Sequence, residues 1–319
     1  MATNTTSTMS ANLPSEYYRK VLLAVMDETL QFYPLGLKCP LPKNSGKVAK
    51  WLIYSKLSAA TTALVEGVPP SDTALTTGNA TATVAQYGSY TKISDLLEAT
   101  AIDPVVKSAM ERMGKQGALT IDTLCRNELT TNLPNQFANG KASLAATGAN
   151  DVMTAKEFLK AAITMKKNSV GPHTGQDYIA VVHSANLGDI MNDTNIGSWV
   201  DLNKYIEPGA KRAFVGEAGK VYSVRILESQ NVSSTTSGTL SSATVYACPV
   251  LGEEAFGVVS LDSKNISTFV KPAGSGGSLD PLDQVGTVGW KALGFVPKYL
   301  GAVNSAPDRG VQIRAGSAY

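Results

Sequence analysis

Two strand-like segments, with a long and nearly uncharged stretch between them, constrain this sequence more than any other feature. Gly46 to Lys56 and Ala80 to Thr91 are rich in Val, Ile, Thr and aromatic residues, which predicts two strands joined by a long tip. Glu66 and Asp72 are the only charges from Leu57 to Thr91. A two-stranded ribbon is marginal in water by itself, and an exposed uncharged tip invites aggregation. We therefore expect the hairpin to lie across a neighbouring molecule, although a hairpin folded back on its own domain would explain these residues nearly as well.

The N-terminal region predicts a helix followed by an irregular arm. Residues 1–14 form a Thr- and Ser-rich tail, and Ser15-Glu16 opens an amphipathic helix that runs to about Phe32. Prolines remove backbone donors and fix an extended path, and three of them follow at Pro34, Pro40 and Pro42. We expect an extended arm here, and not a second helix.

The middle of the chain predicts two helices. Asp103-Pro104 starts a helical stretch that runs to about Thr131, with the proline in the first turn, where its missing N–H costs little. Gly114 and Gly117 each cost about 1 kcal/mol relative to alanine, so we expect a kink or break there. Thr154 and Glu157 form a capping-box pattern for a second helix to about Lys167.

From Gly171 onward the pattern changes to short strands and turns. The expected strands cover residues 177–182, 220–228, 243–248 and 287–303. A short helix is expected over residues 184–192 and a surface hairpin tip over 231–238. Glu253-Glu254 is expected to place negative charge at a helix start. Together with the helices above, these segments predict a mixed α+β fold.

The composition describes a globular chain that is short of charge. Apolar residues make up 43% and charged residues 17% of the sequence, against a typical charged fraction of about 25%. A monomer keeps its whole exterior in water, so this shortage suggests that partners cover much of the surface. The formal net charge of +2 is too balanced for a dedicated nucleic-acid binder, which neutralises phosphates with an excess of Lys and Arg.

No constellation of residues predicts catalysis, a metal site or a cofactor. The three cysteines and two histidines are scattered and match no zinc, redox or catalytic motif, which leaves buried, reduced thiols as the expectation. We therefore expect a protein that is not an enzyme and holds no cofactor. Core or interface anchors are expected at Trp51, Trp199 and Trp290. The apolar run Val21 to Met26 is too short for a signal peptide or a membrane span, so no membrane partner is expected.

Several short motifs, taken in order along the chain, carry a family resemblance. They are Tyr33-Pro34-Leu35, Glu66-Gly67 with the prolines after it, Gln86-Tyr87-Gly88, Val181-Val182-His183, Gly216-Glu217-Ala218-Gly219, and the run from Asp280-Pro281-Leu282 to Trp290-Lys291. With these motifs the sequence resembles the major capsid proteins of tailed phages, in particular the family typified by the podophage N-four coat protein. The resemblance implies the Hong Kong ninety-seven (HK-type) capsid fold.

That fold implies a division of the chain into four parts. They are an N-terminal arm over residues 1–45, an E-loop over 46–92, a P-domain over 93–170 and 271–319 with a spine helix at 103–131, and an A-domain over 171–270.

The resemblance also implies a function. The subunit would self-assemble through pentamers and hexamers into an icosahedral phage head that encloses double-stranded DNA without sequence-specific binding. It would be made in the cytoplasm of a bacterial host and end in the virion. Its partners would be other copies of itself, a portal, a separate scaffolding protein, and in some shells a decoration protein. A related alternative is an encapsulin-like compartment that encloses enzymes, and one from another class is a mixed α/β hydrolase or binding protein.

The sequence differs from some relatives of this family in two ways. Some relatives weld their shells with an E-loop lysine, but no lysine lies between Lys56 and Lys92, which predicts a non-covalent shell. Some relatives carry a cleaved N-terminal scaffolding segment, whereas here the arm helix begins within about fifteen residues of Met1, which predicts a separate scaffolding protein or none. The candidate contacts between subunits are Glu66, Asp72, Lys47, Lys50, Lys56, Tyr87, Arg19 and Trp290.

Overall fold

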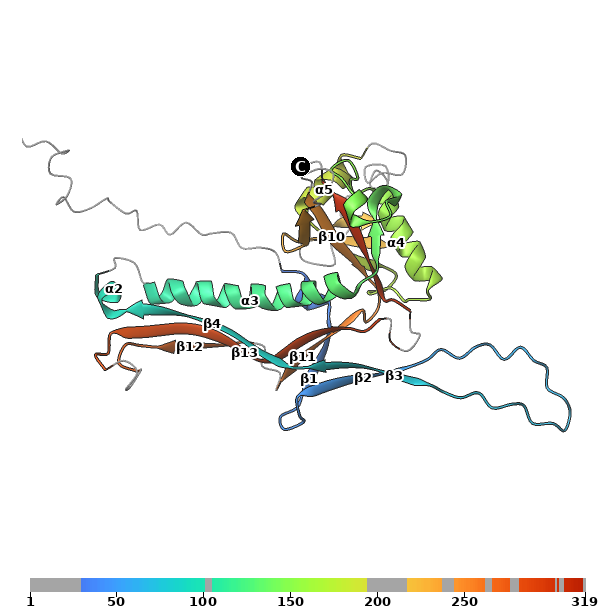
Figure 1. The fold of residues 1–319 in the computed structure, drawn as a ribbon, viewed down its shortest axis with the longest axis horizontal. Helices are drawn as coiled ribbons and strands as arrows, with labels where there is room; N and C mark the ends of the chain where they lie inside the picture. Colours follow the sequence, from blue (N-terminus) through green and yellow to red (C-terminus); the bar gives the residue numbers. More distant parts are fainter. Residues whose placement is uncertain are drawn as a thin grey trace, which may run out of the picture.

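The computed structural model describes residues 30–100, 105–193, 217–236, 244–261, 266–275, 281–301, 303 and 307–317. It has three regions: a long platform, a compact unit packed on one part of it, and a hairpin that projects beyond it (Figure 1). Helices and strands are mixed in the α+β manner predicted. The helix predicted over 15–32 lies outside the described residues except for its last three. Of these, Phe32 opens the short helix α1 (Phe32–Leu35).

The platform is a five-stranded sheet with one long helix along one face (Figure 1). Its strand order is β1-β11-β13-β12, and β4 also pairs with β13. β1 runs parallel to β11, and the other pairs are antiparallel. The strands are β1 (Leu37–Leu41), β4 (Ala85–Ser94), β11 (Phe256–Leu261), β12 (Ser267–Lys271) and β13 (Val285–Tyr299). Because β13 is long and central, segments from both halves of the chain meet on it.

The platform helix α3 (Val105–Asn132) is one continuous helix of 28 residues, so the prediction of a kink or break at Gly114 and Gly117 was wrong. Gly117 serves close packing instead. A Cβ at this position would lie 3.1 Å from Cδ2 of the Trp290 indole on β13. The absence of a side chain therefore lets the indole approach the helix backbone. A short helix, α2 (Asp95–Thr100), follows β4 at the end of the platform and precedes α3 in the chain.

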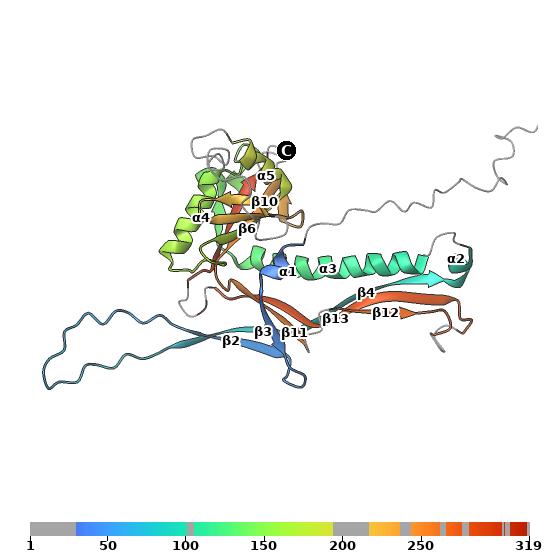
Figure 2. The ribbon, with the colours of Figure 1, turned by 180° about the vertical axis from the view of Figure 1, so that it is seen from behind.

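The hairpin pairs β2 (Val48–Tyr54) with β3 (Thr77–Thr83) in antiparallel register. The strand predicted over 80–91 is in fact two strands, because the chain changes partner at Val84. β3 stays in the hairpin, whereas β4 joins β13 in the platform. Both views show the hairpin pointing away from the end of the platform that carries α2 (Figure 2).

The compact unit is built on a seven-stranded sheet with the order β5-β14-β10-β6-β8-β7, and β9 also pairs with β10. The strands are β5 (Asn135–Phe137), β6 (Tyr178–Val182), β7 (Glu217–Val221), β8 (Val224–Glu228), β9 (Ser233–Thr236), β10 (Thr244–Leu251) and β14 (Gly310–Gly316). The helices are α4 (Ala155–Lys167), α5 (Ser184–Met191) and two 3-10 turns, Ala138–Gly140 and Leu144–Ala146. β6 is buried along its whole length, as a central strand covered on both faces must be.

One hydrophobic core runs through the platform and the compact unit. Its largest fully buried side chains are Phe32, Phe158, Phe256, Phe295, Leu129, Met153, Met165, Ile179, Ile190, Ile226, Leu227 and Leu251. These residues come from the arm, α3, both sheets and both helices of the compact unit. The two regions are therefore packed against each other as one body.

The C-terminal half confirms some local predictions and corrects others. The segment 220–228 is two strands, β7 and β8, joined at Tyr222, which adopts a left-handed backbone with φ of +51°. Glu253-Glu254 forms a turn between β10 and β11, so the predicted helix start was wrong. Thr154 is the N-cap of α4, as predicted, but its side chain makes no capping hydrogen bond. The helix over 184–192 and the strands over 177–182, 243–248 and 287–303 are confirmed within about four residues.

Candidate assembly surfaces

The hairpin loop, residues 55–76, exposes apolar side chains that would be costly on a monomer in water. Leu64 is 74% exposed and Val65 is 67% exposed. Other exposed apolar residues of the hairpin are Val48, Leu52, Tyr54, Leu57, Val68 and Leu75. Many exposed apolar side chains gathered on one segment of a soluble protein indicate an interaction site. The hairpin thus has the chemistry of a contact surface.

The predicted contact residues fall into three settings. Exposed on the hairpin or beside it are Lys47, Lys50, Lys56, Glu66 and Asp72. Inside the chain are Tyr87, half-buried against the core, and Trp290, only 4% exposed, with its Nε1–H donating to Gln116 Oε1 at 3.1 Å. Arg19 and the anchor predicted at Trp199 lie outside the described residues. A contact between subunits stays a prediction for all of these residues. The burial of Trp290 within its own chain argues against such a contact for that residue.

A buried carboxylate anchors the arm to the platform helix. Asp122 of α3 is fully buried, and its Oδ1 accepts the backbone N–H groups of Phe32 at 2.9 Å and Tyr33 at 2.8 Å. Its Oδ2 accepts Nδ2–H of Asn231 at 2.9 Å, and Arg126 Nη1 donates to Asn231 Oδ1 at 2.9 Å. One side chain therefore ties together the arm, the helix and the loop before β9.

Burial shapes the electrostatics of this anchor. Desolvation raises the pKa of Asp122 above its usual range, while the N–H donors of Tyr33, Asn231 and Phe32 offset part of that rise. Nearby, the Lys38 Nζ lies 3.3 Å from the Tyr33 ring centroid and donates to the Tyr33 carbonyl. Burial lowers the pKa of Lys38. The arm is thus held by buried polar contacts to Asp122 and by a contact of Lys38 nearer the surface.

Replacing Asp122 with alanine is expected to lower the free energy of unfolding by about 2–4 kcal/mol, because three buried donors lose their acceptor. The amides of Phe32 and Tyr33 should also exchange hydrogen faster. Urea unfolding and native-state hydrogen exchange measure both effects. Thr123→Ala is the matched control, because its hydroxyl donates to the same Asn231 at a longer 3.3 Å, so it should cost less than about 1 kcal/mol. Unchanged amide protection in Asp122→Ala would show that the carboxylate does not hold the arm.

A shallow groove crosses the platform face opposite α3. On β13, Trp290 points to α3, so by the alternation of a strand Gly289 and Lys291 point to the other face. Gly289 lies opposite Tyr90 of β4 on one side and opposite Phe269 of β12 on the other. The groove has a volume of about 390 Å³. We call it the sheet trough.

The sheet trough has a glycine floor, aromatic walls and a basic rim. Gly88 and Gly289 form the floor, and a Cβ on Gly289 would lie 2.8 Å from Cβ of Tyr90, which disfavours any side chain there. Tyr90 is 65% exposed and Phe269 51% exposed. The rim carries the exposed lysines Lys92, Lys271 and Lys291. No carboxylate of the described residues pairs with these three lysines.

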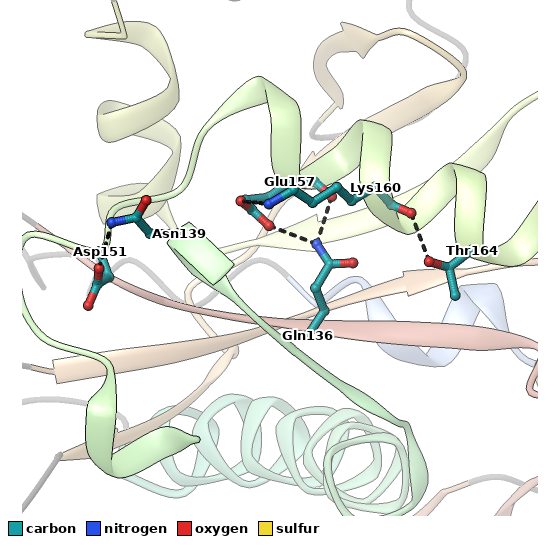
Figure 3. A network of polar contacts seen from close by, with 6 residues as sticks. All are labelled: Gln136, Asn139, Asp151, Glu157, Lys160 and Thr164. Carbon is teal, nitrogen blue, oxygen red and sulfur yellow. Dashed lines mark hydrogen bonds and ion pairs between the residues drawn. The ribbon is translucent and has the colours of Figure 1, made fainter. Parts of the chain in front are cut away.

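A polar network fastens β5 to α4 in the compact unit (Figure 3). Gln136 Nε2 donates to Glu157 Oε2 and to the Glu157 carbonyl, both at 2.9 Å, and Lys160 Nζ donates to Glu157 Oε1 at 2.8 Å. Asn139 Nδ2 donates to Asp151 Oδ1 at 3.1 Å. Both carboxylates are buried and are satisfied within the chain, so this network supports the fold and offers no free acid or base.

A second charged cluster joins β6 to the β7–β8 hairpin. Asp177 Oδ2 accepts Nε–H of Arg225 at 2.8 Å, and its Oδ1 lies 2.7 Å from Lys220 Nζ. Arg225 Nη1 also lies 3.5 Å from Glu217 Oε1. Burial by itself would raise the pKa of Asp177, but the two cations outweigh it and hold the pKa below its usual value.

His183 and Cys248 take structural positions. The His183 ring stacks on Tyr246 at 4.2 Å between centroids and accepts the N–H of Ala185, which caps α5. Burial raises the pKa of the Cys248 thiol to about 12. Among the described residues, no group of three or more His, Cys, Asp or Glu side chains could hold a metal ion. In that same part of the chain, no helix combines the length and apolar character needed to cross a membrane.

Sequence reasoning found the hairpin but missed the anchor and the sheet trough. Asp122 gave a weak signal, since it falls on the helical stripe of Cys125 and Leu129, where a charged residue must be buried. The trough gave none, because its walls come from strands that are far apart in the sequence.

Comparison with protein families gives a match over most of the chain. The family model described as phage capsid protein matches residues 77–305. No curated protein matches the sequence.

Solved structures show a similar fold over nearly the full length. The capsid of Ralstonia phage GP4 has 12% sequence identity and a TM-score of 0.73, with 96% of each chain covered. The capsid of Helicobacter pylori bacteriophage KHP30 has 12% identity and a TM-score of 0.70, covering 99% of this chain and 98% of that one. The cyanophage Pam1 capsid has 16% identity and a TM-score of 0.69, covering 97% and 98%. At these identities the likeness shows a shared fold, which is the HK-type fold expected.

Proposed function

The chain belongs to the phage capsid protein family, and from this membership we propose how its surfaces build the shell. As a major capsid protein it forms an icosahedral head, and its place is the virion capsid. The family match leaves the encapsulin-like and hydrolase alternatives without support. The observation that carries the proposal is the hairpin, whose exposed apolar loop projects away from the body of its own chain. We propose that this hairpin lies across a neighbouring subunit.

Our proposal for the assembly is a set of pentamers and hexamers, held by ring contacts that repeat around each axis. A head-to-tail contact closes into a ring when its rotation fits, and each contact in a ring can be modest because there are many. We also propose that the chain is made in the host cytoplasm. Its partners would be a portal and a separate scaffolding protein or none. The shell would enclose double-stranded DNA without reading its sequence, which the near-neutral net charge supports.

We propose the division into arm, E-loop, P-domain and A-domain by analogy with the HK-type fold. The packing of the chain supports changing three of the boundaries in this division. β4 pairs with β13, which supports ending the E-loop near Val84 instead of residue 92. β11 and β12 also pair with β13 and so group with the P-domain. α4, β5 and β14 pack in the compact unit, which supports placing them in the A-domain.

Electron microscopy and light scattering of the purified full-length chain test this function. Rings, tubes or closed shells tens of nanometres across are expected, alone or with the phage scaffolding protein. Particles boiled in denaturant should give a single monomer band on a gel, because no lysine for a covalent weld lies in the E-loop between Lys56 and Lys92. A ladder of covalent oligomers would overturn the non-covalent shell. A monomer that persists at high concentration with the scaffold present would overturn the assembly proposal.

A further inference from the structure

One face of the hairpin base lies against the platform, and it carries a single large side chain. Trp51 of β2 lies opposite Ala80 of β3, and Ala49 lies opposite Ala82, so by the alternation of a strand these four side chains share one face. The three alanines are buried, and β3 packs against β13. Alanine lets the hairpin approach the platform closely but buries little apolar area. The half-buried indole of Trp51 is therefore the largest group in this contact.

The indole of Trp51 lies directly on the backbone of β11. A Cβ at Gly257 would lie 2.7 Å from Cζ2 and 2.9 Å from Cε2 of the indole, closer than a real Cβ can come. A glycine is therefore needed for the ring to occupy this place. The indole Nε1–H also donates to Sγ of Cys39 on β1 at 3.3 Å, and because sulfur is a weak acceptor this bond orients the ring more than it stabilises it. The side chain thus joins the hairpin to two strands of the platform.

The contact of Trp51 is separate from the main hydrophobic core. Among the described residues, that core takes no side chain from β2 or β3. At the base of the hairpin the Val84 N–H donates to the Lys47 carbonyl at 3.0 Å, and the turn before β2 places Asn44 and Gly46 in the left-handed region. A hairpin joined to the body by two short connections and one contact can move as a unit at low cost. Its direction therefore depends on that contact.

A cleft separates the outer part of β2 from the compact unit. Its volume is about 560 Å³. Among its lining residues are Ile53 and Lys56 on the side of the hairpin, and Gly171, Glu253 and Arg309 on the side of the compact unit. Within the described residues, the hairpin beyond Trp51 therefore meets open space on this side, and no packing there fixes its angle.

We propose that Trp51 is the positioning residue of the hairpin. Its indole, placed on Gly257, fixes the direction in which the hairpin leaves the platform. This inference rests on the proposed function, in which the hairpin lies across a neighbouring subunit, because the direction of the hairpin then sets the angle between two subunits. A head-to-tail contact closes only when its rotation fits, so an angle repeated at every contact sets the curvature and the diameter of the shell.

Thiol labelling of the full-length chain before assembly tests the contact itself. Cys39 is half-buried against the indole, and the other two cysteines are fully buried, so Ellman's reagent reports on Cys39 in the folded chain. Gly257→Ala, which forces the ring aside, should raise the labelling rate about fivefold or more, and so should Trp51→Ala. Leu52→Ala, on the opposite face of β2, is the matched control and should leave the rate unchanged. An unchanged rate in Gly257→Ala would show that the indole does not hold this place, and the proposal fails.

Electron microscopy of assembled particles tests the direction of the hairpin. Gly257→Ala and Trp51→Ala should give tubes, open sheets or shells of mixed diameter, with the yield of normal shells lowered about tenfold or more, because the contact between subunits then has the wrong rotation to close. Trp51→Phe keeps a ring over the glycine and should restore shells of the normal diameter. A residue that only stabilised the hairpin would lower the yield and leave the diameter unchanged. Shells of one normal diameter from both alanine variants would therefore overturn the inference.

The two measurements separate this inference from the proposed function. If the unaltered chain forms no shells with or without the scaffolding protein, the proposed function fails, whereas the labelling rates still show whether Trp51 holds the hairpin. If the unaltered chain forms shells and the variants show neither faster labelling nor altered diameters, the capsid function stands and the role of Trp51 is wrong.

Discussion

A chain whose hairpin loop is cut short is expected to fold normally and to form no closed shells. In this variant residues 56–75 are replaced by Asn-Gly, which favours the two-residue turn that joins hairpin strands. Ser55 and Thr76 already face each other, with the Ser55 N–H donating to the Thr76 carbonyl at 3.0 Å, so the strands keep their register. The removed loop has no buried residue, so its loss takes nothing from the core.

The expected stability of the shortened chain follows from the entropy of loop closure. Each halving of a flexible loop saves about 0.6 kcal/mol, so the free energy of unfolding should stay level or rise slightly. Shell yield should fall at least tenfold, measured by light scattering on a sizing column and by microscopy. Thr61→Ala with Thr62→Ala keeps the length, charge and apolar residues of the loop and should assemble normally. Shells of normal size from the shortened chain would show that the hairpin loop is dispensable for assembly.

The features that sequence could predict are those set by local pattern. β6 is a run of apolar residues buried on both faces, and α4 follows a polar N-cap with an apolar stripe, so each was found within one or two residues. The hairpin was predicted because the scarcity of charge from Leu57 to Thr91 is a property of one continuous segment. In these cases the residues that decide the structure are neighbours along the chain.

The features that sequence missed depend on partners far along the chain. Nothing near Val84 marks the point where one strand becomes two, because the change is set by pairing with β13, some two hundred residues later. The turn between β7 and β8 places Tyr222, and not a glycine or asparagine, in the left-handed region, so the usual turn signal is missing. Gly117 suggested a kink because the reason for a glycine at this position is remote in sequence. That reason is the close packing of the Trp290 indole against the helix.

The same distinction applies to the hairpin tip and the sheet trough. The hairpin tip could be read from composition, whereas the sheet trough requires three strands to be placed side by side. Tyr90 and Phe269 look like ordinary strand residues until Gly289 is seen to separate them. A surface of this kind follows only from the register of the sheet.

Removing the indole that joins α3 to the sheet is expected to give the largest loss of stability in this chain. Trp290→Ala should lower the free energy of unfolding by about 3–5 kcal/mol, because a buried aromatic side chain is replaced by a cavity that the helix cannot close. Urea unfolding followed by circular dichroism measures this loss. Trp290→Phe keeps most of the ring and should cost clearly less, since Gln116, which accepts the indole N–H, is exposed and can turn to water.

The close contact between Gly117 and Trp290 makes a size exchange informative. Gly117→Leu alone should cost about 1–3 kcal/mol through overpacking, because a Cβ at this position would already lie 3.1 Å from the indole. Combined with Trp290→Ala, the new side chain enters the vacated space, so the double variant should be more stable than Trp290→Ala alone. Gly114→Ala, where a Cβ meets no atom within 4 Å, should instead stabilise the helix by about 1 kcal/mol. Simple additivity of Gly117→Leu and Trp290→Ala would show that the two residues do not share the packing that holds α3 to the platform, and the spine of the subunit would need another explanation.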